Sequence, residues 1–185
     1  IFVKGVGALE PADVTVDLDV VAEDLDGDEA GGKISITIDS VAPITLDLDN
    51  DGVEYLSRDA GVVFTDEESG ESVNTAWVGP DDGLLVIDAD QSGTVNEAKE
   101  YVFTEWSDTA ETDMEAVAEV FDTNQDGVLD ANDERFDEFA VWQDADSDGV
   151  TDEGELTSLV DLGVDSIALD YSADSTSGTA ADGDV

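Results

Sequence analysis

Hydrophobic and polar residues alternate in two stretches near the start of the chain, a pattern typical of half-buried β-strands. Valine or leucine occupies every second position over 14–20, and isoleucine does so over 34–38. The two stretches predict a β-hairpin, and the acidic turn 23–29 between them is a candidate cation loop. Two strands alone are marginally stable in water, so we expect the hairpin to pair with a further strand.

The chain after Pro43 alternates between short apolar runs and acidic loops. Strands are expected at 53–56, 62–65, 84–87, 140–143 and 164–171, and helices at 97–106, 111–121, 133–139 and 156–162. Residues 172–185 are rich in serine, glycine, aspartate and alanine, which predicts a flexible linker. We therefore expect an α+β fold, in which an insert of EF-hand-like calcium loops, helices and β-strands lies next to or within a partial β-sandwich hairpin.

The clearest chemical motif is the acidic loop from Asp144 to Glu155, which reads DADSDGVTDEGE. Oxygen-bearing side chains recur at alternate positions, and Ca²⁺ takes about six to eight oxygen ligands from a loop of this kind. Gly149 stands where the chain must turn sharply, which a Cβ would hinder. The alternative is an acidic Asp-Gly turn on a solvated surface. The predicted ligands are Asp144, Asp146, Asp148, the carbonyl of Val150, Asp152 and Glu155.

Two further loops match most of this pattern. The loop that begins at Asp122 closes with aspartate instead of glutamate, which predicts weaker or less selective Ca²⁺ binding. In the loop that begins at Asp88, lysine occupies the twelfth position and the glutamate comes one residue late. The predicted ligands are Asp122, Asn124, Asp126, Val128, Asp130 and Asp133 in the first loop, and Asp88, Asp90, Ser92, Thr94 and Glu100 in the second.

A fourth loop carries half of the motif. Asp47, Asp49 and Asp51 precede Gly52 with the expected spacing, but Arg58 occupies the closing position and cannot bind a cation. A calcium turn that borrows ligands from elsewhere and a plain hairpin turn are both open interpretations of this segment.

The composition is strongly acidic, with 50 acidic and 5 basic residues and a formal net charge of −45. The hydrophobic content of 41% is nevertheless enough for a core. Such a surface repels nucleic acid and anionic membranes, and its self-repulsion opposes folding unless cations intervene. A halophilic or marine origin is an alternative cause of the acidity. Cysteine and histidine do not occur, which excludes disulfides, thiolate metal sites and imidazole catalysis. No apolar run reaches membrane-spanning length, so membrane insertion is not expected.

Four motifs, at 46–52, 77–85, 121–130 and 141–156, occur in an order that resembles a known module. They are similar to the calcium-dependent self-processing module of iron-regulated RTX proteins and to its relatives in giant bacterial RTX adhesins. The resemblance implies that the late Glu100 closes the Asp88 loop.

Residues 13–40 separately resemble the closing hairpin of the immunoglobulin-like repeats in such adhesins. The expected domains are therefore a hairpin of an immunoglobulin-like, split sandwich at 1–41, an EF-hand-like calcium-binding module at 42–171, and the linker at 172–185.

Self-processing relatives cleave an Asp–Pro bond just before the first of these motifs, through attack of the aspartate side chain on its own carbonyl. Pro43 matches that proline, but Ala42 stands where the aspartate is needed and has no nucleophile. The resemblance therefore implies that this chain does not cleave itself as written, and that it would do so only with aspartate at residue 42.

We expect a calcium-stabilised structural module of an extracellular bacterial RTX adhesin, either secreted or held at the cell surface. A self-cleaving and cross-linking module inactivated at Ala42 is one alternative. A domain that binds a peptide or glycan is another, in which Trp77 and Trp142 line a groove, although core packing is the usual role of such residues. The expected partners are Ca²⁺ and the neighbouring domains of a longer adhesin, and the expected state is a monomer.

Overall fold

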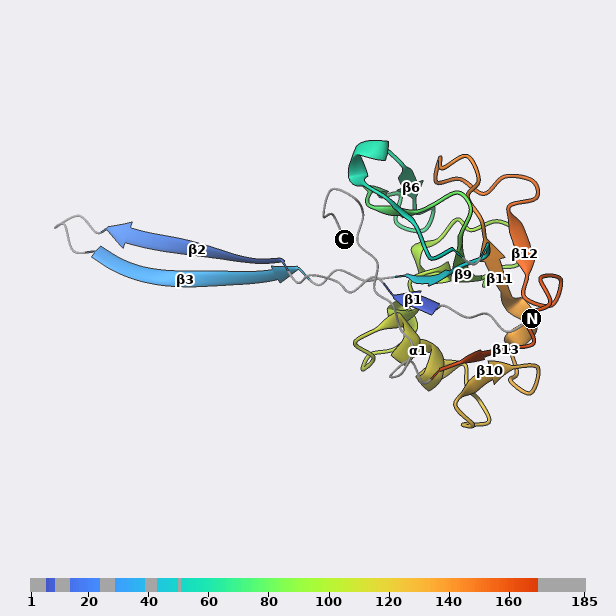
Figure 1. Cartoon of the computed structure of the whole chain (residues 1–185). Helices are drawn as coiled ribbons and strands as arrows, with labels where there is room; N and C mark the ends of the chain where they lie inside the picture. Colours follow the sequence, from blue (N-terminus) through green and yellow to red (C-terminus); the bar gives the residue numbers. More distant parts are fainter. Residues whose placement is uncertain (1–5, 9–13, 24–28, 39–42, 50, 170–185) are drawn as a thin grey trace. The chain divides into compact units, whose positions relative to one another are not determined.

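The computed structural model describes residues 6–8, 14–23, 29–38, 43–49 and 51–169. The chain divides into a smaller unit, Pro11–Ser40, and a larger unit made of Ile1–Glu10 and Val41–Val185 (Figure 1). The expected cation loop at 24–28, Ala42 and the expected linker lie outside the described residues.

The smaller unit contains one long hairpin. Strands β2 (Val14–Glu23) and β3 (Glu29–Ile38) pair antiparallel over ten residues each, from Val14 opposite Ile38 to Glu23 opposite Glu29. The hairpin predicted from the alternation is therefore present and is longer than the apolar pattern indicated. Within the described residues, these two strands form a sheet of their own.

A five-stranded antiparallel sheet organises the larger unit. Its strands follow the order β1 (Val6–Ala8), β4 (Ile44–Leu46), β9 (Gly83–Ile87), β11 (Phe139–Trp142) and β12 (Leu156–Ser158). The central pair, β9 and β11, runs from Ile87 opposite Phe139 to Leu84 opposite Trp142. Because these strands come from distant parts of the chain, the sheet brings the acidic loops that follow β4, β9 and β11 onto one scaffold.

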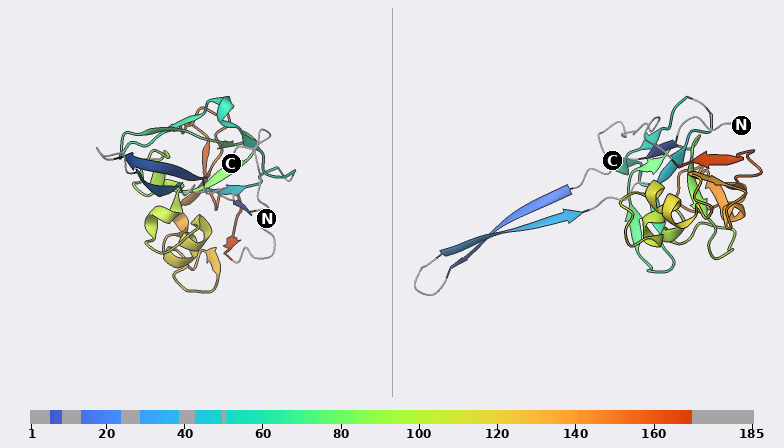
Figure 2. Two further views of the ribbon diagram at one scale, coloured as in Figure 1. Left: turned by 90° about the vertical axis from the view of Figure 1, so that its left-hand side faces the viewer. Right: turned by 90° about the horizontal axis from the view of Figure 1, so that it is seen from below.

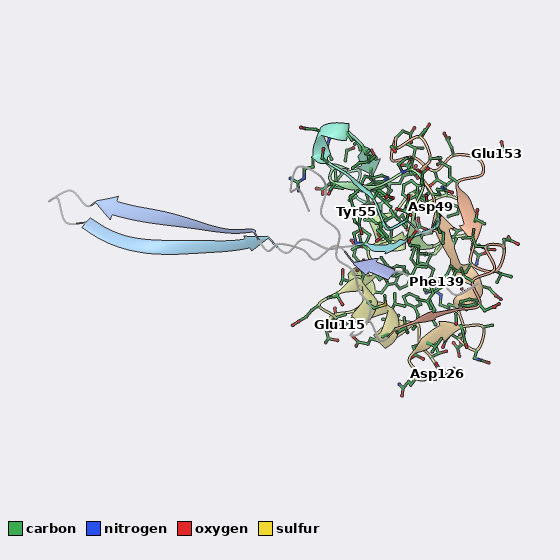
Figure 3. All side chains as sticks on the ribbon, in the orientation of Figure 1. Asp49, Tyr55, Glu115, Asp126, Phe139 and Glu153 are labelled. Carbon is green, nitrogen blue, oxygen red and sulfur yellow. The ribbon has the colours of Figure 1, made fainter. Side chains whose placement is uncertain are left out.

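Both faces of this sheet are covered. Side chains alternate across a strand, so Leu85 and Val141 pack into one core while Val86 and Trp142 pack into the other. On the first side lie α1 (Asp113–Val120) and the paired strands β10 (Val128–Asp130) and β13 (Ser166–Ala168). On the second lie the pairs β5 (Tyr55–Leu56) with β8 (Trp77–Val78), and β6 (Val63–Thr65) with β7 (Ser72–Asn74) (Figures 1 and 2). Phe139 lies among the packed side chains, whereas Asp126 lies at the periphery (Figure 3).

The expectation of an α+β fold with EF-hand helices is wrong. Among the described residues, α1 is the one α-helix, and the remainder is mostly short strands. The expected helix 97–106 is two short 3-10 turns, η2 (Ala98–Glu100) and η3 (Phe103–Trp106). The expected helix 133–139 is reduced to the 3-10 turn η4 (Phe136–Glu138), and 156–162 begins with strand β12.

Tertiary burial explains these differences. The side chain of Glu100 is fully buried and accepts N–H groups of the preceding loop, so this segment is held as one short turn against that loop. Leu156 pairs with Trp142 in the central sheet, so the backbone that follows the Asp144 loop is extended. In these segments, successive tight turns bury apolar residues that have helical spacing. The spacing alone therefore does not distinguish such turns from an α-helix.

The short helix α1 begins at an unusual buried carboxylate. Thr112 caps the helix through a hydrogen bond from the Glu115 N–H at 3.2 Å, and Asp113 follows with 2% of its surface exposed. One oxygen of Asp113 accepts the Thr104 N–H at 2.7 Å, and its other oxygen has no hydrogen-bond partner. Burial raises the pKa of Asp113 to about 6.

We expect Asp113 to make the stability of the larger unit depend on pH. Between about pH 4 and pH 6 the folded state holds a proton that the unfolded state has lost, so the free energy of unfolding falls as pH rises. The rise of the Asp113 pKa from 3.8 to about 6 on folding corresponds to a loss of about 2–3 kcal/mol of unfolding free energy across this window. Asp113→Asn cannot ionise, so its unfolding free energy should lack this component in urea titrations across that window. Glu111→Gln, an exposed acid just before the same helix, should keep it; equal pH profiles for wild type and Asp113→Asn would contradict the assignment.

Candidate metal-binding loops

Three acidic loops share one backbone conformation. In the loops that begin at Asp88, Asp122 and Asp144, the fourth residue has a left-handed backbone although it is not glycine, and the sixth is a left-handed glycine. The φ angles are 60°, 60° and 58° at Gln91, Gln125 and Ser147, and 78°, 80° and 77° at Gly93, Gly127 and Gly149. Residues with a Cβ disfavour this region. Its recurrence at the same place in three loops indicates a common local structure rather than three unrelated turns.

The first carboxylate of each loop is held by two backbone N–H groups, those of the fifth and sixth residues. The distances to the two oxygens are 3.0 and 3.1 Å at Asp88, 3.2 and 2.9 Å at Asp122, and 3.1 and 2.9 Å at Asp144. A carboxylate has about four lone-pair sites, so each of these groups keeps capacity for a cation.

The last carboxylate of each loop joins the two ends of the loop. Glu100, Asp133 and Glu155 each accept the N–H groups of the second and ninth loop residues, one on each oxygen. The distances are 3.1 and 2.9 Å at Glu100, 2.8 and 2.9 Å at Asp133, and 2.9 and 2.9 Å at Glu155. The late glutamate of the Asp88 loop and the shorter aspartate of the Asp122 loop therefore occupy the same structural place as Glu155.

The Asp144 loop brings most of its predicted ligands together. Carboxylate oxygens of Asp144, Asp146 and Glu155 lie within 4.8 Å of one another, as do those of Asp146, Asp148 and Asp152. Asp144 is fully buried, while the side chain of Val150, whose carbonyl is the predicted ligand, is 56% exposed.

The other loops differ in how closely their carboxylates approach. Asp88, Asp90 and Glu100 form a cluster within the same 4.8 Å limit, and Ser92 and Thr94 of that loop hydrogen-bond to each other. Asp47, Asp49 and Asp51 also form such a cluster, on an exposed turn.

The Asp122 loop has no such group among the described residues. Its third residue is Asn124, whose amide donates to Asp126, and Asp130 accepts the N–H of Asn132. Val128 begins strand β10 and donates its N–H to Asp126. Several polar groups of this loop are therefore engaged with one another.

The electrostatic state of the loop carboxylates varies with their surroundings. Burial raises the pKa of Asp144 and of Glu100. Loss of hydration, followed by repulsion from neighbouring carboxylates, raises the pKa of Asp146. At Asp133 partial burial acts in the same direction, but hydrogen bonds that include the Thr123 hydroxyl hold the pKa below its usual value. Nearby positive charge would relieve the repulsion at Asp146.

Three residues that support the loops were missed by the sequence analysis. The Trp77 indole donates to Asp144 at 2.7 Å. Asp82, fully buried, accepts the N–H of Leu48 and thereby fixes the backbone of the Asp47 loop. Thr151 accepts the Val95 N–H at 2.9 Å, which joins the Asp144 loop to the Asp88 loop. Each contact spans more than thirty residues, and no local sequence signal indicates it.

Trp77 and Trp142 are only 3% and 0% exposed, respectively. They pack against each other with ring centroids 5.4 Å apart. They belong to the core, so the expectation that they line a ligand groove is wrong. Pro43, the residue after the expected cleavage position, is half-buried. No helix within the described ranges is both long enough and apolar enough to cross a membrane.

The sequence that carries the acidic loops matches a known family. The SPM domain family matches residues 44–184, more than half of the chain, and the chain belongs to this family. The chain is also 37% identical over 135 residues to the iron-regulated protein FrpA of Neisseria meningitidis serogroup C. That similarity covers 70% of this chain and 12% of FrpA, and it agrees with the RTX-type link expected from the four motifs.

Proposed function

We propose that the larger unit is a calcium-dependent structural module of an exported RTX-type adhesin. The observation that carries the proposal is the arrangement repeated in the Asp88, Asp122 and Asp144 loops, where backbone N–H groups hold the first and last carboxylates in place. Fixed carboxylates lose little conformational freedom when a cation binds. Oxygen ligands on an irregular loop suit Ca²⁺ better than Mg²⁺, which requires a smaller octahedral shell.

The charge of the chain supports the same function. A formal net charge of −45 opposes compaction, and the loops concentrate that charge at points close to the central sheet. A dication in each loop would convert local repulsion into attraction between loop residues that the sheet already positions. The module would therefore be loosely folded in a calcium-poor compartment and rigid where calcium is abundant.

The adhesin context rests on the RTX-type similarity. The chain spans about one eighth of the length of FrpA, which supports a module that works beside neighbouring domains of a longer protein. We propose an extracellular or cell-surface location and a monomeric state. Trp77 and Trp142 are both buried, so neither is available to line a groove for a peptide or glycan.

A self-cleaving module is the second candidate function, and membership of the SPM domain family together with Pro43 favours it. The step would need the side chain of residue 42 to attack its own carbonyl carbon, and Ala42 has no oxygen to do so. We therefore propose that the chain as written stays intact in calcium.

Calcium added to the full chain tests both proposals, the first through isothermal titration and the second through intact-mass measurement. Isothermal titration should show at least two calcium ions per chain, and Asp144→Asn and Asp88→Asn should each remove one. Asp59→Asn, an exposed acid outside the loops, should bind the same number as wild type. Wild type that takes up no calcium at millimolar concentration would refute the calcium proposal. Fragments seen by intact-mass measurement after calcium addition would refute the proposal that the chain stays intact.

A further inference from the structure

We infer that Trp77 is a positioning residue for the Asp144 loop. Through its hydrogen bond to Asp144, the packing of the aromatic core would affect how tightly this loop binds calcium. The inference rests on the proposed calcium function. Trp77 lies on strand β8, 67 residues before Asp144, and its indole Nε1 donates to Asp144 Oδ2 at 2.7 Å. Both side chains are buried, with exposures of 3% and 0%.

The other two loops provide an internal comparison. Asp88 and Asp122 are each held by the N–H groups of their own fifth and sixth residues. Asp144 has the same two bonds, and Trp77 adds a third donor from outside the loop. Two donors therefore converge on Oδ2, while Oδ1 has one longer bond of 3.1 Å from the Asp148 N–H. Oδ1 therefore has more lone-pair sites left for binding a cation than Oδ2 has.

The indole can hold the carboxylate because its own position is fixed. The Trp77 ring packs against Trp142, Tyr101 and Phe64, with centroid distances of 5.4, 6.2 and 6.4 Å. Hydrogen bonds that orient a metal-binding side chain typically change metal affinity by about 10–100-fold when they are removed. Trp77 would act in this way on the first ligand of the loop.

Trp142 is a matched control within the same cluster. It is fully buried, its ring contacts Trp77 and Phe64, and its Nε1 has no hydrogen-bond partner. Replacement of either tryptophan by phenylalanine removes the same atoms from the same core. Only the replacement at Trp77 removes a donor from Asp144.

The experiment compares Trp77→Phe with Trp142→Phe in the full chain by calcium titration. We expect Trp77→Phe to weaken one calcium site by about 10–100-fold and Trp142→Phe to change it less than about threefold. Directly excited Tb³⁺ luminescence, which does not depend on a tryptophan sensitiser, provides a second probe, and Tb³⁺ affinity should fall in the same variant. In an Asp144→Asn background, Trp77→Phe should leave the affinities of the remaining sites unchanged.

Different results would refute the proposed calcium function and the role of Trp77. A wild type without calcium binding would refute the proposed function. If Asp144→Asn loses one calcium site while Trp77→Phe binds calcium as tightly as wild type, the inference alone is refuted. Equal weakening in both tryptophan variants would show a packing effect and would also refute it. If Trp77→Phe does not fold in saturating calcium, a tryptophan analogue at position 77 with sulfur in place of the N–H preserves the ring shape and decides the question.

Discussion

Removal of calcium should lower the free energy of unfolding of the larger unit by about 5–8 kcal/mol. A ligand present at a hundredfold its Kd contributes about 2.7 kcal/mol per site, and two or three filled loops give this range. Ordinary domains have a total stability of about 5–15 kcal/mol, so this loss is a large part of the stability of the calcium-bound form. Urea titrations in saturating calcium and in excess chelator, followed by near-ultraviolet circular dichroism of the buried tryptophans, measure the difference.

In that experiment, the stabilisation that comes from calcium bound in the loops must be distinguished from the stabilisation that any salt gives by screening charge. Sodium chloride at matched ionic strength should recover a small part of the lost stability, because it weakens repulsion between surface carboxylates. Magnesium at the calcium concentration should recover less than calcium does. Identical unfolding curves in calcium and in chelator would contradict the prediction.

Gly149→Ala should destabilise the larger unit by about 2–5 kcal/mol and abolish the Asp144 site. The residue has φ of 77°, a region that costs alanine about 1–2 kcal/mol. A Cβ there would lie 2.5 Å from the carbonyl oxygen of Val63 and 2.8 Å from its carbonyl carbon. Backbone atoms cannot rotate away, so overpacking adds about 1–3 kcal/mol. Urea denaturation and calcium titration of the variant measure the two effects.

Gly127→Ala is the control for Gly149→Ala. Gly127 occupies the same position in the Asp122 loop with φ of 80°, but a Cβ there meets nothing within 4 Å. This variant should lose only the backbone component, about 1–2 kcal/mol. Equal losses in the two variants would show that the contact between the Asp144 loop and strand β6 does not determine the cost.

The acidic loops could be predicted from the sequence because their structure is local. The spacing of carboxylates and a glycine at the sixth position specify the turn. Glu100, for which the resemblance implied a closing role, and Asp133 join the two ends of their loops through hydrogen bonds, and their binding of a cation stays a prediction. The hairpin β2–β3 was predicted for the same reason, since alternation with period two is a property of neighbouring residues.

The helices after the loops were not predicted correctly because distant contacts decide their conformation. Leu156 is extended because it pairs with Trp142, and Phe103, whose ring packs against Phe121 and Phe139, begins a second 3-10 turn instead of continuing the first. The hydrogen bonds that Trp77, Asp82 and Thr151 make to the loops are non-local in the same sense. A single sequence lists the residues that make such contacts, but it does not show which residues contact each other in the folded protein.

The bond between Thr151 and Val95 has a consequence for how the module responds to its surroundings. It joins the eighth residue of one loop to the eighth residue of another, so ordering of either loop restrains the backbone of its neighbour. If both loops bind calcium as proposed, this bond would couple the two sites, and they would fill together over a narrow span of ion concentration. The proposed export would then take the chain across a threshold, and both loops would become ordered in a single step.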